Sequence, residues 1–165
     1  MREMIKTLAL VSLLLLSACS AGYTVAQQNP AAGFPYRHSD FDYKVAWKTT
    51  EANNAVVIDG ILKNVRYPYI ISLDLTVFLV GPDGKVRARA TTVPVPQYSR
   101  VDEVIHFNAE LQNVSINKGD TFKFAIHYTG DEGGRYDRVD WLSTFAVDAI
   151  TGTVLNKDNL KSGEW

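Results

Sequence analysis

Two of the three histidines could bind a metal ion together. His106 and His127 fall on consecutive expected strands, on the faces opposite the large apolar residues. As cross-strand neighbours they could share a metal with Glu103 or Glu110, because imidazole and carboxylate groups are zinc ligands. Two separate solvent-facing histidines are the alternative, and we predict no metal site here.

The acidic segment between residues 130 and 140 could form a second kind of site. Its carboxylates belong to Asp131, Glu132, Asp137 and Asp140. Carboxylates at this density can hold calcium through their oxygens. However, their spacing differs from the EF-hand pattern, and two arginines dilute the charge. We therefore expect a solvated polar loop, and neither a metal nor another cofactor.

Motifs for common enzyme chemistry do not occur in the chain. It contains no Gly-x-Ser-x-Gly nucleophile motif and no glycine loop of the phosphate-binding type. Its one cysteine, Cys19, has a different predicted role. We predict a protein that is not an enzyme; an enzyme with a dispersed site is an alternative.

Aromatic residues near strand ends are the candidates for a binding surface. Tyr67 and Tyr69 precede the third expected strand, and Phe78 lies on its otherwise polar face. Tyr136 and Trp141 lie in or beside a loop. Aromatic residues are enriched in binding surfaces, although they are also ordinary core residues. If Phe78 lay at an exposed sheet edge, a partner could add a strand there.

The first 19 residues have the layout of an export signal. Arg2 and Lys6 precede an apolar run over 8–16, and small residues lead from that run to Cys19. The run is about half as long as the roughly 20 apolar residues that a transmembrane helix needs.

The sequence Leu16-Ser17-Ala18-Cys19 resembles the lipobox of bacterial lipoproteins. The resemblance implies cleavage before Cys19, a diacylglyceryl group on its sulfur, and a fatty acid such as palmitate on its new amino terminus. Several acyl chains on one residue anchor a protein stably in a membrane. Ser20, rather than Asp, follows the cysteine. In such lipoproteins this implies the outer membrane, with the domain facing the periplasm.

Three segments follow from this organisation. Residues 1–18 are the predicted signal peptide, residues 19–40 the lipidated cysteine and a flexible tether, and residues 41–165 a folded domain. The tether is rich in Gln, Asn, Pro, Ala and Gly, a composition that buries little apolar surface. Its last residues, Tyr36, Arg37 and His38, are expected to pack onto the domain edge. With 17 basic and 18 acidic residues and no basic patch, the chain is not expected to bind nucleic acid.

The domain is predicted to be built from β-strands, because its apolar residues recur with a period of two. On the third strand, Ile71, Leu73, Leu75, Val77 and Leu79 form the expected inner face. About seven strands at regular spacing predict an all-β, antiparallel, immunoglobulin-like β-sandwich, with a small barrel as the alternative. The expected strands are 41–47, 56–62, 70–80, 86–90, 101–111, 122–128 and 141–147, with 154–155 after a tight turn.

Three short motifs occur in an order that resembles the immunoglobulin-like domains of the FxLYD type in bacterial envelope proteins. They are Gly60-x-Leu62-x-Asn64, Gly81-Pro82-Asp83-Gly84-Lys85 and Asn117-Lys118-Gly119-Asp120-Thr121-Phe122-x-Phe124. The resemblance covers residues 55–129 and implies a small sandwich domain. Together with the lipobox, it predicts a lipid-anchored envelope lipoprotein that binds protein or supports an envelope assembly. A small-molecule or metal-binding lipoprotein is the alternative.

Overall fold

Residues 29–134 and 138–155 are described by a computed structural model, and the regular elements among them are all β-strands. The predicted signal peptide, Cys19, the predicted tether as far as residue 28, Tyr136 and Asp137 lie outside these ranges. No helix in the described part of the chain has the length and apolar character needed to cross a membrane. The strands are β1 (Tyr36–Ser39), β2 (Tyr43–Ala52), β3 (Ala55–Asn64), β4 (Tyr69–Val80), β5 (Val86–Thr92), β6 (Ser99–Arg100), β7 (Val104–Gln112), β8 (Thr121–Asp131) and β9 (Arg138–Asp148).

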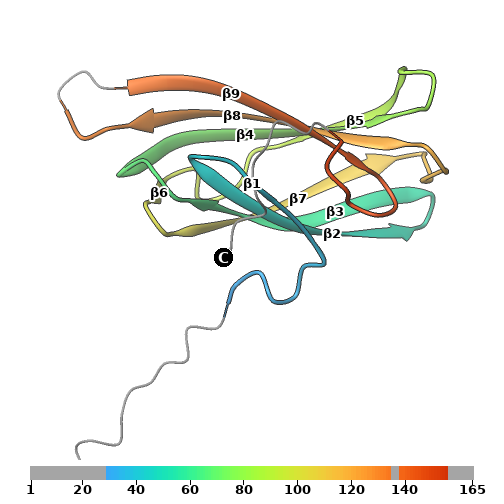
Figure 1. Ribbon diagram of the computed structural model, residues 1–165, viewed down its shortest axis with the longest axis horizontal. Helices are drawn as coiled ribbons and strands as arrows, with labels where there is room; N and C mark the ends of the chain where they lie inside the picture. Colours follow the sequence, from blue (N-terminus) through green and yellow to red (C-terminus); the bar gives the residue numbers. More distant parts are fainter. Residues whose placement is uncertain (1–28, 135–137, 156–165) are drawn as a thin grey trace, which may run out of the picture.

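The strands form two antiparallel sheets that face each other as a sandwich (Figure 1). One sheet has the order β1-β2-β3-β7 and the other the order β5-β4-β8-β9, with the short β6 paired to β4. The expected all-β immunoglobulin-like sandwich is therefore confirmed, and its seven long strands are β2, β3, β4, β5, β7, β8 and β9. In the constant-type immunoglobulin arrangement the fourth strand joins the first, second and fifth. Here the fourth long strand, β5, pairs with the third instead.

The core lies between the sheets and follows the period-two pattern. Trp47 is fully buried at its centre, where its ring lies 5.0 Å from Phe124 and 5.9 Å from Phe145. Leu73, Leu75, Val77 and Leu79 point inward as predicted. Ile71 does not, because a bulge between Ile70 and Ser72 shifts the register and buries Ile70 in its place.

The sandwich begins earlier than residue 41. Tyr36–Ser39, which fall within the segment assigned to the tether, form the edge strand β1 against β2. Ahead of β1, Ala31 and Phe34 pack on the outer face of the same sheet, over Ala46 and Ile61. Arg37 secures this segment by donating to the carbonyl of Ala31 at 3.1 Å. The expected packing of the last tether residues onto the domain edge is thus observed.

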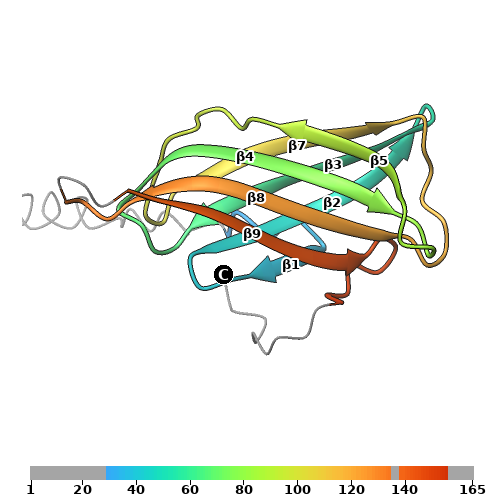
Figure 2. The same ribbon diagram turned by 90° about the horizontal axis from the view of Figure 1, so that it is seen from above.

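The polar loop predicted over 130–140 is largely strand. The β8–β9 ladder continues from Thr121↔Asp148 to Asp131↔Arg138 without a shift, so only the hairpin tip lies outside it. Gly130 has a packing role in this extension. A Cβ at Gly130 would lie 2.8 Å from the ring of Tyr67, so only glycine lets that ring rest on the ladder. Viewed from above, the sandwich is elongated, with this hairpin at one tip (Figure 2).

Candidate functional site

The histidines do not form a joint site. β7 belongs to one sheet and β8 to the other, so His106 and His127, both exposed, lie on the two opposite outer faces of the sandwich. The expectation that they could be cross-strand neighbours was wrong, because consecutive strands here cross between sheets. His127 lies 3.9 Å from Asp74 instead. No group of three or more metal-ligating side chains occurs among the described residues.

The acidic residues near the β8–β9 hairpin each contact a different neighbour. Asp131 accepts a hydrogen bond from the backbone of Gly133 at 2.7 Å, and Asp140 accepts one from the hydroxyl of Thr129 at 2.5 Å. Glu132 pairs with Arg66 at 3.5 Å. These described carboxylates therefore fix the hairpin and its turn rather than converge on one point.

The aromatic candidates occupy quite different environments. Tyr67 is fully buried beneath the hairpin, and Tyr69 is half-buried, with its ring stacked 5.2 Å from Tyr98. Phe78 does not lie at a sheet edge, because β4 is flanked by β5 and β8. Its cross-strand neighbours are Arg89 and Lys123. Strand addition at Phe78 is therefore ruled out, and of the described candidates only Trp141 offers a large exposed apolar surface.

Trp141 belongs to a group of side chains at one end of the sandwich that we call the aromatic end: Phe41, Arg66, Tyr67, Trp141 and Leu142. Phe41 is 53% exposed, and its ring meets Trp141 edge-on with centroids 6.0 Å apart. The Arg66 guanidinium lies 4.9 Å from the Phe41 ring centre and 5.1 Å from that of Tyr67. Leu142, on the outer face of β9, is 66% exposed.

A short chain of hydrogen bonds supports the aromatic end from the side. Ser143 donates to Asp40 at 3.1 Å, and its oxygen lies 2.7 Å from the hydroxyl of Tyr43. Because the serine proton is directed to the carboxylate, Tyr43 donates to Ser143. Burial raises the pKa of Tyr43 well above its ordinary value, so the phenol stays protonated and keeps this role. These bonds join the β1–β2 turn to β9.

Asp42 is the most perturbed carboxylate of the aromatic end. It is 2% exposed, and one of its oxygens has no hydrogen-bond partner among the described residues. Burial, and then the nearby charge of Asp40, raise the pKa of Asp42 to about 6. Its backbone carbonyl accepts from Val65 at 3.0 Å, so the β1–β2 turn is fixed to the β3–β4 turn.

Asn64 shapes the β3–β4 turn that presents Arg66 and Tyr67. Its buried side-chain oxygen accepts from the backbone of Arg66 at 3.2 Å and of Tyr67 at 3.1 Å. Its amide nitrogen donates to the Tyr67 carbonyl at 2.7 Å. A buried asparagine that satisfies both polar groups in this way substitutes for a backbone turn. The Gly60-x-Leu62-x-Asn64 motif is therefore structural: Asn64 sets this turn, and a Cβ at Gly60 would lie 2.5 Å from the Phe107 ring.

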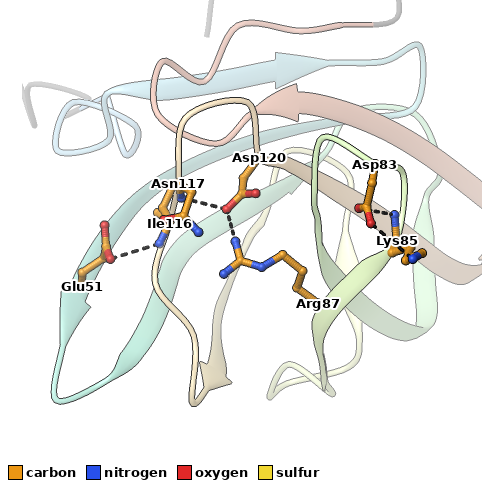
Figure 3. Close-up of polar contacts among 7 residues, drawn as sticks. All are labelled: Glu51, Asp83, Lys85, Arg87, Ile116, Asn117 and Asp120. Atoms are coloured by element: carbon orange, nitrogen blue, oxygen red, sulfur yellow. Dashed lines mark hydrogen bonds and ion pairs between the residues drawn. The ribbon is translucent and has the colours of Figure 1, made fainter.

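The other two motifs meet at the opposite end, which we call the turn end (Figure 3). Arg87, next to the 81–85 turn, forms an ion pair with Asp120, which is 1% exposed and closes the 117–120 turn. The same Asp120 oxygen accepts from the backbone of Asn117 at 2.8 Å. The turns also touch directly, since a Cβ at Gly119 would lie 3.3 Å from Pro82. The motif residues thus hold the β4–β5 hairpin against the β7–β8 connection between the two sheets.

The outer edge of β9 beside the aromatic end lacks backbone partners in the described part of the chain. The backbone of Leu155 donates to Ala146 at 2.8 Å, and that of Asp148 donates to Thr153 at 2.9 Å. Even-numbered residues of β9 therefore point their N–H and C=O groups away from β8. By the same alternation, Asp140, Leu142 and Thr144 direct theirs outward too, and no described residue pairs with them.

Sequence reasoning missed most of this surface. Phe41 was expected to begin the strand 41–47, yet it precedes β2 and is exposed. The adjacent pair Trp141-Leu142 held the available signal. Two consecutive large apolar residues on a strand lie on opposite faces, so at least one of them faces away from the core.

Comparison with known proteins finds distant structural similarity alone. No family model matches the chain, and no curated protein matches its sequence. Among solved structures, the GAE domain of yeast GGA1 is 12% identical, with a TM-score of 0.46 over 68% of this chain and 98% of that one. A β-glucuronidase of glycoside hydrolase family 2 is 11% identical, with a TM-score of 0.36 over 61% of this chain and 11% of that one. The chain is an all-β, immunoglobulin-like sandwich of two antiparallel sheets.

Proposed function

We propose that this chain is a lipid-anchored lipoprotein of the bacterial cell envelope that binds a protein partner and is not an enzyme. In this proposal Cys19 bears the lipid in the outer membrane, and the sandwich faces the periplasm. The lipobox-like Leu16-Ser17-Ala18-Cys19 supports the anchor. The proposed assignment to the FxLYD type rests on the three motifs, whose residues form turns and core contacts here.

The exposed surface of the aromatic end is the observation on which the binding role depends. Phe41, Trp141 and Leu142 present aromatic and aliphatic surface to solvent around the cationic Arg66. Tyr, Trp, Phe and Arg are enriched at protein interfaces, and tryptophan and arginine often dominate their binding energy. The hydrogen bonds of Asp40, Tyr43 and Ser143 hold the backbone beneath this surface. A surface fixed in advance loses less entropy on binding.

Site-specific photo-cross-linking in the native host tests this function. A photoreactive amino acid at Leu142 should cross-link one defined envelope protein, and the same amino acid at Glu110, exposed on the other sheet, should not. The Cys19→Ala variant should lose both metabolic labelling with a palmitate analogue and the cross-link. Equal cross-linking from both sites, or labelling that persists without Cys19, would contradict the proposal.

A further inference from the structure

Part of the outer edge of β9 has main-chain hydrogen-bonding groups without partners in the described ranges 29–134 and 138–155. Asp140, Leu142 and Thr144 each direct one N–H and one C=O outward, with no partner among the described residues. Leu142 is 66% exposed on one face of this stretch, and Trp141 is 38% exposed on the other. Main chain and side chains are therefore accessible at the same place.

The same edge already binds an extended segment of its own chain farther along. Residues 153–155 run antiparallel to β9, with a bridge between Val147 and Val154. The N–H of Asp148 donates to the carbonyl of Thr153 at 2.9 Å, and the N–H of Leu155 donates to the carbonyl of Ala146 at 2.8 Å. The twist and pleat of β9 thus allow an added antiparallel strand, and the free residues continue that ladder toward the aromatic end.

Folded proteins usually protect such an edge with charges, proline, bulges or a covering segment. The other edge of this sheet has these features: β5 bears Arg87 and Arg89, its register with β4 shifts at Leu79/Val80, and Pro94 follows it. It also lies beside β7. Over residues 140–144, β9 has no register shift and no proline, and it exposes a leucine. Its one charged side chain there, Asp140, accepts a hydrogen bond from Thr129 on the neighbouring strand β8.

We propose that the edge of β9 from Asp140 to Thr144 binds an extended segment of the partner polypeptide as an added antiparallel strand. This inference rests on the proposed function and names the partner's recognised feature. Main-chain hydrogen bonds supply affinity in such complexes, and pockets for alternate side chains supply specificity. Here the partner residue opposite Trp141 would be apolar, because Phe41 and Trp141 flank that position. The residue opposite Ser143 would be small and polar, because Asp40 and Tyr43 lie beside it.

A second copy of this chain fits the edge less well. Two β9 edges can pair symmetrically over residues 140–144 with either Trp141 or Leu142 at the centre, because both registers match the outward-directed even-numbered residues. The first register brings the two Asp140 carboxylates onto neighbouring diagonal positions of one face, where like charges repel. The second places Trp141 opposite Ser143 of the other copy, so that neither position receives the kind of side chain proposed above. An extended partner segment has no such restriction.

Nuclear magnetic resonance can test the edge with a model strand. The probe is an acetylated and amidated peptide, Thr-Val-Thr-Leu-Thr-Val-Thr, added at millimolar concentration to the isotope-labelled chain from Ser20 to Trp165. We expect shifts of the Asp140, Leu142 and Thr144 amides, with at least several-fold slower hydrogen exchange. Leu142→Pro removes an outward N–H without touching the β8 ladder, and it should abolish the response.

Two controls separate main-chain pairing from simple apolar contact. Leu142→Thr keeps the N–H and should still bind the peptide. In the second control, the peptide is methylated on two consecutive central nitrogens. Because these nitrogens point to opposite edges of the peptide strand, neither edge can pair fully, and the peptide should not bind. This control still tests main-chain pairing if Leu142→Pro fails to fold.

Three outcomes would overturn the inference. They are an unchanged β9 edge at millimolar peptide, amides already protected in the free chain at every concentration, or protection that appears only at high protein concentration. The second would mean that the chain covers its own edge, and the third that a second copy does. Failure of the envelope cross-link with peptide binding intact would instead reject the proposed function.

Discussion

A buried aspartate lies at each end of the sandwich, and the two differ in their electrostatic surroundings. At the turn end, Asp120 pairs with Arg87 and accepts from the backbone of Asn117 (Figure 3). At the aromatic end, Asp42 lies near a second carboxylate, Asp40, which together with burial raises its pKa to about 6. Asp120 is thus paired with a cation, whereas Asp42 has another carboxylate as its neighbour.

This difference separates a structural end from the end that we propose to be functional. Structure alone favours compensated charges, because burying an uncompensated charge costs free energy. Sites that bind or react often contain groups that the fold does not compensate. The aromatic end also leaves Phe41, Trp141 and Leu142 exposed beside a free strand edge. We therefore expect substitutions at the turn end to act on stability, and those of the exposed residues Phe41, Trp141 and Leu142 to act mainly on binding.

The largest stability effect is expected from Asp120→Ala. The change removes the partner of Arg87 and the acceptor of the Asn117 N–H, and should lower the free energy of unfolding by about 2–4 kcal/mol. Urea unfolding measures it. Asp83→Ala is the matched control, because Asp83 pairs with exposed Lys85 at 3.6 Å and should cost no more than about 0.5 kcal/mol. Equal losses would mean that the turn end does not depend on its buried ion pair.

Gly130→Ala should have the next largest effect. The new Cβ would meet the Tyr67 ring at 2.8 Å, so the ring must move, at a cost of about 1–3 kcal/mol. Near-ultraviolet circular dichroism should change along with the unfolding free energy, because Tyr67 is one of the aromatic rings of the aromatic end. At Gly33 a Cβ would meet no atom within 4 Å, so Gly33→Ala should leave both signals unchanged. If Gly130→Ala changed neither the circular dichroism signal nor the free energy of unfolding, Tyr67 would not be held in this position.

The fold was predictable because its signals are local and repeated. Alternation placed Val45, Trp47 and Leu75 in the core, and turn motifs separated the strands. The bulge that exchanges Ile71 for Ile70 was not predictable, because it depends on the pairing of β4 with β8. Sequence alone also placed β1 in the tether, since its four residues become a strand only against β2.

The candidate site was largely hidden because it joins residues from distant parts of the chain. The site combines Phe41 from the β1–β2 connection, Arg66 from the β3–β4 connection and Trp141 from β9. No sequence pattern relates these three positions. His106 and His127 showed the converse error, because closeness in sequence order was taken for closeness in space. Which sheet a strand joins is a property of the topology, and period-two patterning does not report it.

Asp42→Asn should stabilise the protein at neutral pH. The folded pKa of Asp42, about 6, lies above its ordinary value of 3.8, so its protonated form is favoured by folding. The stabilisation of the fold by the protonated Asp42 carboxyl group is complete below about pH 4, and it is lost as the pH rises through 6. Allowing for solvent screening, the asparagine variant should be more stable than the wild type by about 1–2 kcal/mol at pH 7 and about equal to it at pH 4.

Urea unfolding between pH 4 and 7 measures the stability of the wild type and of Asp42→Asn. Subtracting one free energy of unfolding from the other removes the contributions of other titrating groups. His38 is one such group: burial lowers its pKa, so its stabilising contribution is lost as pH falls through its ordinary value of 6.5. A difference between wild type and Asp42→Asn that does not depend on pH would show that Asp42 is not the uncompensated group of the aromatic end.

The smallest stability effect is expected from Leu142→Thr. Leu142 is 66% exposed, and threonine suits a strand, so the free energy of unfolding should change by less than about 0.5 kcal/mol. Val147→Thr is the matched control on the same strand. Val147 is fully buried, and its replacement puts a hydroxyl into the core, at a cost of about 1–3 kcal/mol. If Leu142→Thr cost as much as Val147→Thr, Leu142 would be covered in solution, and the aromatic end would be closed like the turn end. If only the control is destabilised, the exposed leucine is not required for folding, as the proposed role of this surface in partner binding predicts.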